Sequence, residues 1–197
     1  MKTRLALALL TVAFGWAAPA ASPQPAYPVV TPGVEFRFPH DHGAHPDYHT
    51  EWWYFTGWLD APDGRPIGFQ ITFFRSRPGI DSANPSAFAP RQIIFAHAAL
   101  SDPARGKLIH DQRVARQGFG IAEAHEGDAR IALLDWHLER RADGVFHATA
   151  RARDFRLDLA FTPTQPMMLN GERGYSRKGP RPEQASYYYS MPQLAGA

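Results

Sequence analysis

The pattern of apolar and polar side chains along this chain is typical of β-strands, and it is clearest over residues 49–59. This stretch reads HTEWWYFTGWL and holds three of the five tryptophans. Successive side chains of a strand point to opposite faces, which gives one face His49, Glu51, Trp53, Phe55 and Leu59, and the other face Thr50, Trp52, Tyr54, Thr56 and Trp58. Both faces carry large apolar groups. We therefore expect this strand to be covered on both sides, as in the wall of a barrel.

A hairpin follows, because Asp63-Gly64 is a turn signal and residues 67–73 alternate again between apolar and small or polar side chains. Further strands are expected at 34–38, 92–100, 107–114, 119–124, 129–139, 145–151 and 155–161. Residues 129–139 are interpreted as one continuous strand. The strands recur about every ten residues, and no segment carries a helical stripe of useful length. The pattern predicts an all-β, antiparallel fold curled into a barrel.

The C-terminal part of the chain departs from this rhythm. Residues 163–183 are rich in glycine and proline and are predicted to form a long loop, and residues 185–194 resemble the opening of another strand. An aromatic strand that begins so close to the last residue has little to pair with, so the sequence looks cut short. We expect one barrel domain over 34–162, and a connector with the start of a truncated second domain over 163–197.

The N-terminus resembles a secretory signal. Lys2 and Arg4 precede an apolar run over 5–16, and the small residues of Ala18-Pro19-Ala20 suit a signal peptidase. The run is short for a membrane span, so residues 1–20 are interpreted as a cleaved signal peptide and 21–33 as an extended leader, with an uncleaved anchor as the alternative. The protein is then expected to be exported to the periplasm.

Charge and composition argue against a nucleic-acid partner and for a domain with an apolar interior. Removing Lys2 and Arg4 from the 21 basic side chains leaves 19, which equals the number of acidic ones, so the mature chain is near neutral and no nucleic-acid partner is expected. The chain has no cysteine, so its stability must come from core burial. A hydrophobic content of 44% with 13% aromatic residues fits one domain with a large apolar interior or pocket.

Six short motifs carry a family resemblance. In order they are DHGAHPD (41–47), TEWWYFTG (50–57), QITFFR (70–75), AHAALS (96–101), GERGYSRKG (171–179) and ASYYYS (185–190). Together they resemble the carotenoid 1,2-hydratases (hydroxyneurosporene synthases) and the AttH-like, lipocalin-like proteins. The resemblance implies lipocalin-like (calycin-type) barrels, two per protein, with the ligand site near their junction.

What the resemblance implies for function stays open between two classes. One is a cofactor-free hydro-lyase acting on a polyene or other isoprenoid, and the other is a non-catalytic carrier for a lipid or similar apolar ligand, a role that would include association with a membrane transporter. The family's proposed proton donor, an aspartate in a Trp-x-Asp-His type motif, belongs to the second half and has no counterpart in this chain. We expect the missing second domain to pack on the first.

Glu51 is the candidate for acid catalysis. Hydrating an alkene requires a proton donor and a stabilised carbocation, which a carboxylic acid among aromatic faces can provide. The alternative is a structural acceptor bonded to an arginine or a backbone amide. The candidate ligand-binding residues are His49, Trp52, Trp53, Tyr54, Phe73, His97 and Tyr188, and packing alone would equally explain the tryptophans.

Other residues suggest chemistry less strongly. The spacing of His40, His42, His45 and His49 in an irregular loop matches no compact zinc pattern, so no metal is expected. His97 and His137 lie among apolar strand neighbours and are predicted to be hydrogen-bonded core histidines. Two further sets are noted: Tyr187 to Tyr189 as an aromatic surface that could be exposed, and Arg173, Arg177 and Lys178 as an anion site or a solvated loop.

Overall fold

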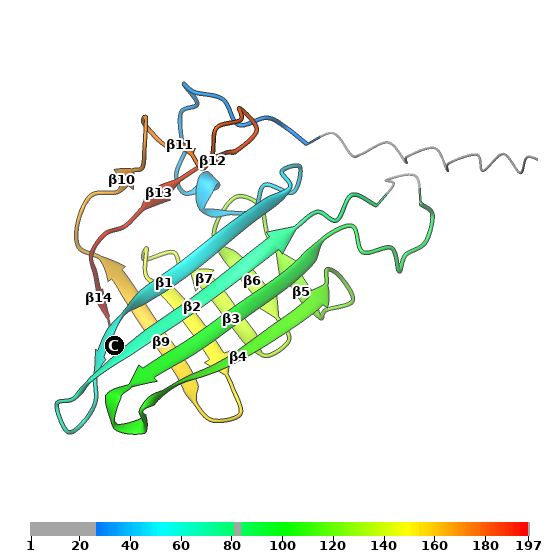
Figure 1. Ribbon diagram of the computed structural model, residues 1–197. Coiled ribbons are helices and arrows are strands. Elements are labelled where there is room, and N and C mark those ends of the chain that lie inside the picture. Colours follow the sequence, from blue (N-terminus) through cyan, green and yellow to red (C-terminus); the bar gives the residue numbers. More distant parts are fainter. Residues whose placement is uncertain (1–26, 81–83, 197) are drawn as a thin grey trace, which may run out of the picture.

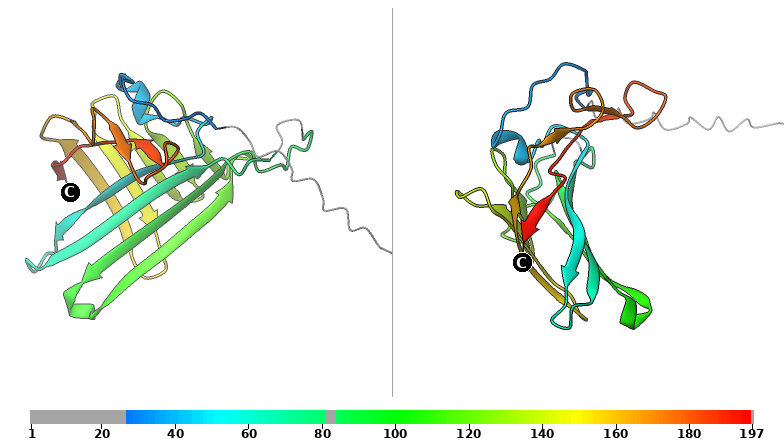
Figure 2. Two further views of the ribbon diagram at one scale, coloured as in Figure 1. Left: turned by 45° about the horizontal axis from the view of Figure 1, so that its top comes forward. Right: turned by 90° about the vertical axis from the view of Figure 1, so that its left-hand side faces the viewer.

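The computed structural model describes residues 27–80 and 84–196. The expected signal peptide (1–20) and residues 21–26 of the expected leader lie outside these ranges. Two antiparallel sheets face each other as two layers, and the N-terminal segment and the C-terminal segment lie together at one end of them (Figures 1 and 2). We call these two segments, residues 27–48 and 164–193, the cap. The prediction of an all-β antiparallel fold is confirmed.

The first sheet has four strands in the order β1-β2-β3-β4. Their bounds are β1 Thr50–Asp60, β2 Pro66–Ser76, β3 Ile93–Asp102 and β4 Lys107–Arg116. The predicted hairpin about Asp63-Gly64 is present, with β1 and β2 in register from Thr50↔Ser76 to Asp60↔Pro66. A 3-10 turn, η2 (Pro103–Arg105), joins β3 to β4 and is capped by the Asp102 carboxylate, which accepts from the Ala104 N–H.

The second sheet has six strands in the order β14-β9-β8-β7-β6-β5. Their bounds are β5 Ala122–Ala124, β6 Arg130–Leu133, β7 Trp136–Arg140, β8 Phe146–Arg151, β9 Arg156–Pro163 and β14 Leu194–Gly196. The last strand returns from the cap to pair with β9, on the side of the sheet nearest β1 (Figure 1).

The prediction of one continuous strand over 129–139 is wrong. Residues Leu134 and Asp135 form a tight turn, and β6 and β7 pair as a hairpin through Leu133↔Trp136. Leu134 adopts a left-handed backbone (φ 56°) and is 49% exposed. The turn shifts the alternation by one position, so the side chains that enter the core are Ile131, Leu133, Trp136 and Leu138.

The space between the two sheets is filled with apolar side chains. From the first sheet, Phe55 stacks on Phe161 of the second with ring centroids 4.8 Å apart, and Phe69 stacks on the same ring at 5.8 Å. Trp136 is fully buried, and its indole N–H donates to the Arg151 carbonyl at 2.9 Å. Burial of this size is the main contribution to folding in a chain without disulfides.

The strand ladders do not close the barrel that the sequence predicts. Within residues 27–80 and 84–196 no ladder joins the four-stranded sheet to the six-stranded sheet, although β14 lies between β9 and β1 in both figures. The two layers are therefore held together by side-chain packing.

The cap consists of turns and very short strands. A 3-10 turn, η1 (His40–His42), is followed far along the chain by β10 Met168–Leu169, β11 Tyr175–Arg177, β12 Ala185–Tyr187 and β13 Tyr189–Ser190. The segment 185–194, predicted to open an unpaired strand, pairs instead with β11 and β10 of the same chain. The strand predicted at 34–38 is absent; Phe36 and Phe38 stack on each other and make edge-to-face contacts with Tyr187 and Tyr189.

Gly43 fixes the cap against the second sheet. A Cβ atom at this position would lie 2.5 Å from the Gly127 nitrogen, so only a residue without a side chain allows so close an approach. The neighbouring Ala44 N–H donates to the His125 carbonyl at 2.8 Å.

In the described part of the chain, neither 3-10 turn nor any other helix has the length and apolar character that crossing a membrane requires.

The unusual turn at Leu134 gives a stability prediction. Replacing Leu134 with Asn should raise the free energy of unfolding by about 1 kcal/mol, because asparagine adopts the left-handed conformation more readily than leucine. Leu133→Ala, one residue earlier and fully buried, should lower the free energy of unfolding by about 2–5 kcal/mol. Urea denaturation of both variants checks this, and a similar loss in each would contradict the turn.

Candidate functional site

The outer face of the four-stranded sheet, turned away from the core, carries an unusual amount of apolar surface. Strand register places Trp52, Phe74, Phe95 and Val114 next to one another across β1 to β4, at the end nearest the cap. The rings of Phe74 and Phe95 stack with centroids 4.6 Å apart. We call this row, together with the outward residues Tyr54 and Trp58 further along β1, the aromatic face.

The aromatic face is covered at one end and open at the other. Tyr188 of the cap packs on Trp52 with ring centroids 6.1 Å apart, and its hydroxyl lies 2.7 Å from that of Tyr54. Burial, followed by the hydrogen bond to Tyr188, raises the pKa of Tyr54. Trp58 is 78% exposed, so the expectation that β1 is covered on both sides holds at its Trp52 end and fails at Trp58.

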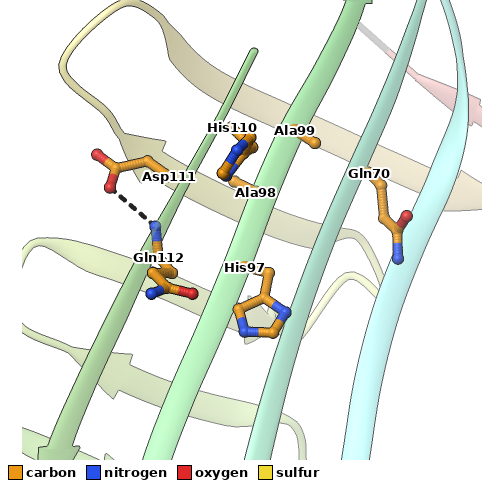
Figure 3. Close-up of a pocket in the computed structure, with 7 residues that line it drawn as sticks. All are labelled: Gln70, His97, Ala98, Ala99, His110, Asp111 and Gln112. Carbon is orange, nitrogen blue, oxygen red and sulfur yellow. Dashed lines mark hydrogen bonds between the residues drawn. The ribbon is translucent and has the colours of Figure 1, made fainter. Parts of the chain in front are cut away.

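A hollow of about 230 Å³ lies beside this row on the same sheet (Figure 3). Its polar side chains come from three neighbouring strands: Gln70 from β2, His97 from β3, and His110 and Gln112 from β4. These amide and imidazole groups are able to donate or accept hydrogen bonds. The face thus combines apolar rings with a few polar groups, which is the usual make-up of a small-molecule site.

The predicted ligand-binding residues are divided between the two faces of the sheet. Trp52, Tyr54 and His97 lie on the outer face, with Tyr188 packed against Trp52 and Tyr54. Trp53 and Phe73 pair with each other on the inner face, where Phe73 is fully buried. These two residues therefore belong to the core and do not line the same surface.

Three histidines singled out in the sequence, His49, His97 and His137, are all exposed. His49 is exposed just before β1, and its ring lies 4.6 Å from that of Tyr27. The prediction that His97 and His137 are core histidines is wrong, because both side chains are exposed on outward-facing strand positions. Their apolar sequence neighbours belong to the opposite face of the strand. His97 contacts the edges of Phe74 and Phe95.

A polar network lies at the junction of the cap and the inner face, and Arg75 is its centre. Arg75 is 1% exposed, and its Nε donates to Glu51 Oε2 at 2.6 Å. Its remaining N–H groups donate to the Tyr48 carbonyl at 2.9 Å, to the Gln92 side chain at 2.9 Å and to the Pro46 carbonyl at 3.4 Å. Glu51 is thus a paired structural acceptor, one of the two roles the sequence left open.

His45 joins Glu51 to a second carboxylate. The His45 backbone N–H donates to Glu51 Oε2 at 2.7 Å, and the ring Nδ1 lies 3.0 Å from Glu51 Oε1. The hydrogen bond to Glu51 is the main reason that the pKa of His45 is raised. On its other side, His45 Nε2 lies 3.5 Å from Asp41 Oδ1, and His40 Nδ1 lies 2.7 Å from the same oxygen.

The Asp41 carboxylate is held in its charged form. Partial burial alone would raise the pKa of Asp41, but the hydrogen bond from the Arg37 N–H, with those from His40 and His45, lowers it overall. The Arg37 N–H donates to Asp41 Oδ2 at 2.6 Å. One Asp41 oxygen is therefore occupied by the backbone, and the other faces the two imidazoles.

His42 plays a different part from its neighbours. Burial lowers the pKa of His42 to about 4, so its ring is neutral. The Tyr189 hydroxyl donates its single proton to the Asp41 carbonyl, so it accepts from His42 Nδ1–H at 2.9 Å. Burial also raises the pKa of Tyr189. The Trp53 indole N–H donates to the His42 carbonyl at 2.8 Å, which ties β1 to the cap.

The remaining candidates are placed in the cap. Tyr187 to Tyr189 are half-buried, so the aromatic surface that the sequence suggests at these residues is not exposed. Lys178 lies 4.5 Å above the Tyr188 ring, and Arg177 donates to the Pro180 carbonyl at 2.9 Å. Arg173 is in a left-handed turn conformation and exposed.

The sequence suggested an arginine partner for Glu51 without identifying Arg75, placed Asp41 only within a family motif, grouped Tyr189 with an aromatic surface, and gave Gln92 no role. The hairpin signal brings Glu51 to within one position of Arg75. The observed pairing is centred on Asp63, twelve residues from Glu51 and twelve from Arg75, whereas a two-residue turn at Asp63-Gly64 would place Ser76 opposite Glu51. Tyr189 contacts the loop from the far end of the chain, and no local pattern predicts that contact.

Comparisons with known proteins agree with this architecture. The family model described as AttH-like matches residues 29–197. A crystal structure of a Nitrosomonas europaea protein provisionally assigned as AttH is 54% identical, with a TM-score of 0.76, over 86% of this chain. The match takes in 50% of that protein, so this chain spans about half its length. No curated protein sequence matches the chain.

The buried ion pair gives a second stability prediction. Glu51→Gln should lower the free energy of unfolding by about 3 kcal/mol, because it leaves the buried Arg75 guanidinium without its countercharge. Asp63→Asn is the matched control, since it removes the carboxylate of the exposed Asp63–Arg65 pair and should cost less than about 1 kcal/mol. Chemical denaturation of both variants measures the difference, and equal losses would contradict a central role for Arg75.

Proposed function

The chain belongs to the AttH-like family, and on this premise we propose that it binds an extended apolar molecule, a lipid or an isoprenoid, on its aromatic face. The observation that carries the proposal is the contiguous row of Trp52, Phe74, Phe95 and Val114 on the outer side of the sheet. Apolar patches of this kind on a sheet face mark binding surfaces.

Packing on the inner side supports this location for the ligand. Phe73, Ile71 and Ile94 are fully buried between the sheets, and Phe161 fills the space opposite them. A bound molecule in that space would have to displace core side chains, which costs several kcal/mol of packing. The outer face requires no such rearrangement, because Trp58 and Val114 are already exposed.

The polar groups of the hollow would orient the bound molecule. His97, Gln70 and Gln112 stand beside the aromatic row and could hydrogen-bond one polar end of the molecule. The apolar remainder would extend along β1 towards Trp58, where the indole face is available. A fatty acid, or an isoprenoid with a hydroxyl or carbonyl end, has this combination of a long apolar body and one polar group.

Carotenoid 1,2-hydration is our second proposal, and it concerns a protein of the relative's full length. Aromatic faces such as those of Trp52 and Tyr54 could stabilise a carbocation intermediate. Glu51 is a poor proton donor for that reaction, because its carboxylate accepts from Arg75 and from the His45 backbone N–H on the other side of the sheet. A proton donor from the portion that this chain does not span would then be required.

The expected export signal in residues 1–20 suits the carrier role. A lipid carrier in the periplasm would pass its ligand to or from a membrane protein, so association with a transporter is part of this proposal. Near-neutral charge after removal of the signal agrees with recognition through apolar contacts rather than through charge.

Ligand binding is tested with cis-parinaric acid, a polyene fatty acid that fluoresces in apolar surroundings. Saturable binding is expected, and Trp58→Ser should raise Kd about tenfold, because covering one indole face contributes about 1.4 kcal/mol. Trp58 is largely exposed, so the variant should keep its fold.

Leu134→Asn is the matched control, since it removes an exposed apolar side chain from the other sheet and should leave Kd unchanged. Incubation of a protein extended to the relative's full length with an acyclic carotene, followed by mass spectrometry, separates the two proposals. Recovery of unchanged carotene supports the carrier, and a product heavier by one water supports the hydratase. An equal loss of parinaric acid binding in both variants would refute the aromatic face as the site.

A further inference from the structure

We propose that His40, Asp41 and His45 form a binding site for a divalent transition-metal ion such as Zn²⁺, with one coordination position open to solvent. The site lies in the cap, on the loop that begins with η1, and is separate from the aromatic face. It does not depend on the proposed lipid binding.

The three side chains bring suitable donor atoms to one point. One atom of each residue lies within 4.8 Å of the others. Both imidazoles approach the same Asp41 oxygen, His40 Nδ1 at 2.7 Å and His45 Nε2 at 3.5 Å. A tetrahedral ion with bonds of about 2.1 Å separates its ligand atoms by about 3.4 Å, so small side-chain rotations would suffice to enclose Zn²⁺.

His45 is held in the way that metal-binding histidines are held. Its Nδ1 lies 3.0 Å from the Glu51 carboxylate, which leaves Nε2 directed at Asp41. Carboxylates that hydrogen-bond the far nitrogen of a histidine fix its orientation and strengthen its bond to the metal. Glu51 is itself fixed by the buried Arg75, so the ring position is set by β1 and β2 rather than by the loop alone.

Electrostatics favours a cation at this point. With neutral histidines, Asp41 and Glu51 carry two negative charges and Arg75 carries one positive charge, so the cluster has a net negative charge. A proton on His45 Nδ1 faces Glu51, which turns the lone pair of Nε2 towards the Asp41 carboxylate at 3.5 Å. Two electron-rich atoms repel each other at that distance, and either a second proton on His45 or a metal ion removes the repulsion.

The choice of ion follows from the donors. Two imidazole nitrogens and one carboxylate oxygen suit Zn²⁺, Co²⁺ or Ni²⁺ better than Ca²⁺ or Mg²⁺, which prefer oxygen alone. Three protein ligands leave a fourth position for water or a ligand atom. His40 is 61% exposed at the side chain, so that position would face solvent.

The experiment uses the chain without a purification tag, stripped with a chelator and titrated with ZnCl₂ in a calorimeter and with CoCl₂ by visible absorption. One equivalent of each ion is expected to bind, and Co²⁺ should give the d–d bands of a four-coordinate site. His40→Ala and Asp41→Asn should each raise Kd at least tenfold, because each removes or weakens one of three ligands.

Two exposed histidines outside the cluster provide the controls. His110→Ala and His137→Ala should leave the Zn²⁺ affinity and stoichiometry unchanged. Zn²⁺ should also raise the melting temperature of the wild type but not that of His40→Ala, whose exposed position allows the variant to fold. Unchanged binding in His40→Ala, or no saturable binding by the wild type, would overturn the proposal.

Discussion

The buried Arg75–Glu51 pair is the interaction on which the arrangement of this molecule depends. A guanidinium that is 1% exposed must have all its N–H groups bonded, and here it collects partners from β1, from the loop before β1 and from Gln92 just ahead of β3. Desolvating the charge is costly, so these partners are required together. The pair thereby fixes how the loop enters the first strand and where the cap meets the sheet.

The two faces of β1 therefore have different surroundings. Inward side chains either join the core, as Phe55 does, or hold the polar network, as Glu51 does. Within the described chain, outward side chains of β1 carry no ion pair, and they are covered by Tyr188 at Trp52 and Tyr54 and exposed at Trp58. A strand that is apolar on both faces is unusual for a protein surface; packing in the core explains the inner face, and the outer face carries the surface that we propose as a binding site.

Local signals predicted the parts of the fold that depend on neighbours in sequence. Alternation and Asp63-Gly64 identified the β1–β2 hairpin, but the five-residue loop 61–65 shifts the register by one residue from that of a two-residue turn, so the pairing of Glu51 with Arg75 did not follow from the sequence. The turn at Leu134 was not predicted, because neither of its two residues is glycine or asparagine and the alternating pattern continues through it. The bond between His42 and Tyr189 joins residues 147 positions apart, and a contact of that range leaves no local trace.

The close approach of Gly43 to Gly127 has a consequence for the order of assembly. The loop can settle only after the β5–β6 turn is in place, and Tyr189 can reach it only once nearly all of the chain has been ordered. Contacts between such distant segments form slowly, because loop closure must precede them. We therefore expect the His42–Tyr189 contact, and the final position of the loop that carries the histidine cluster, to form late in folding.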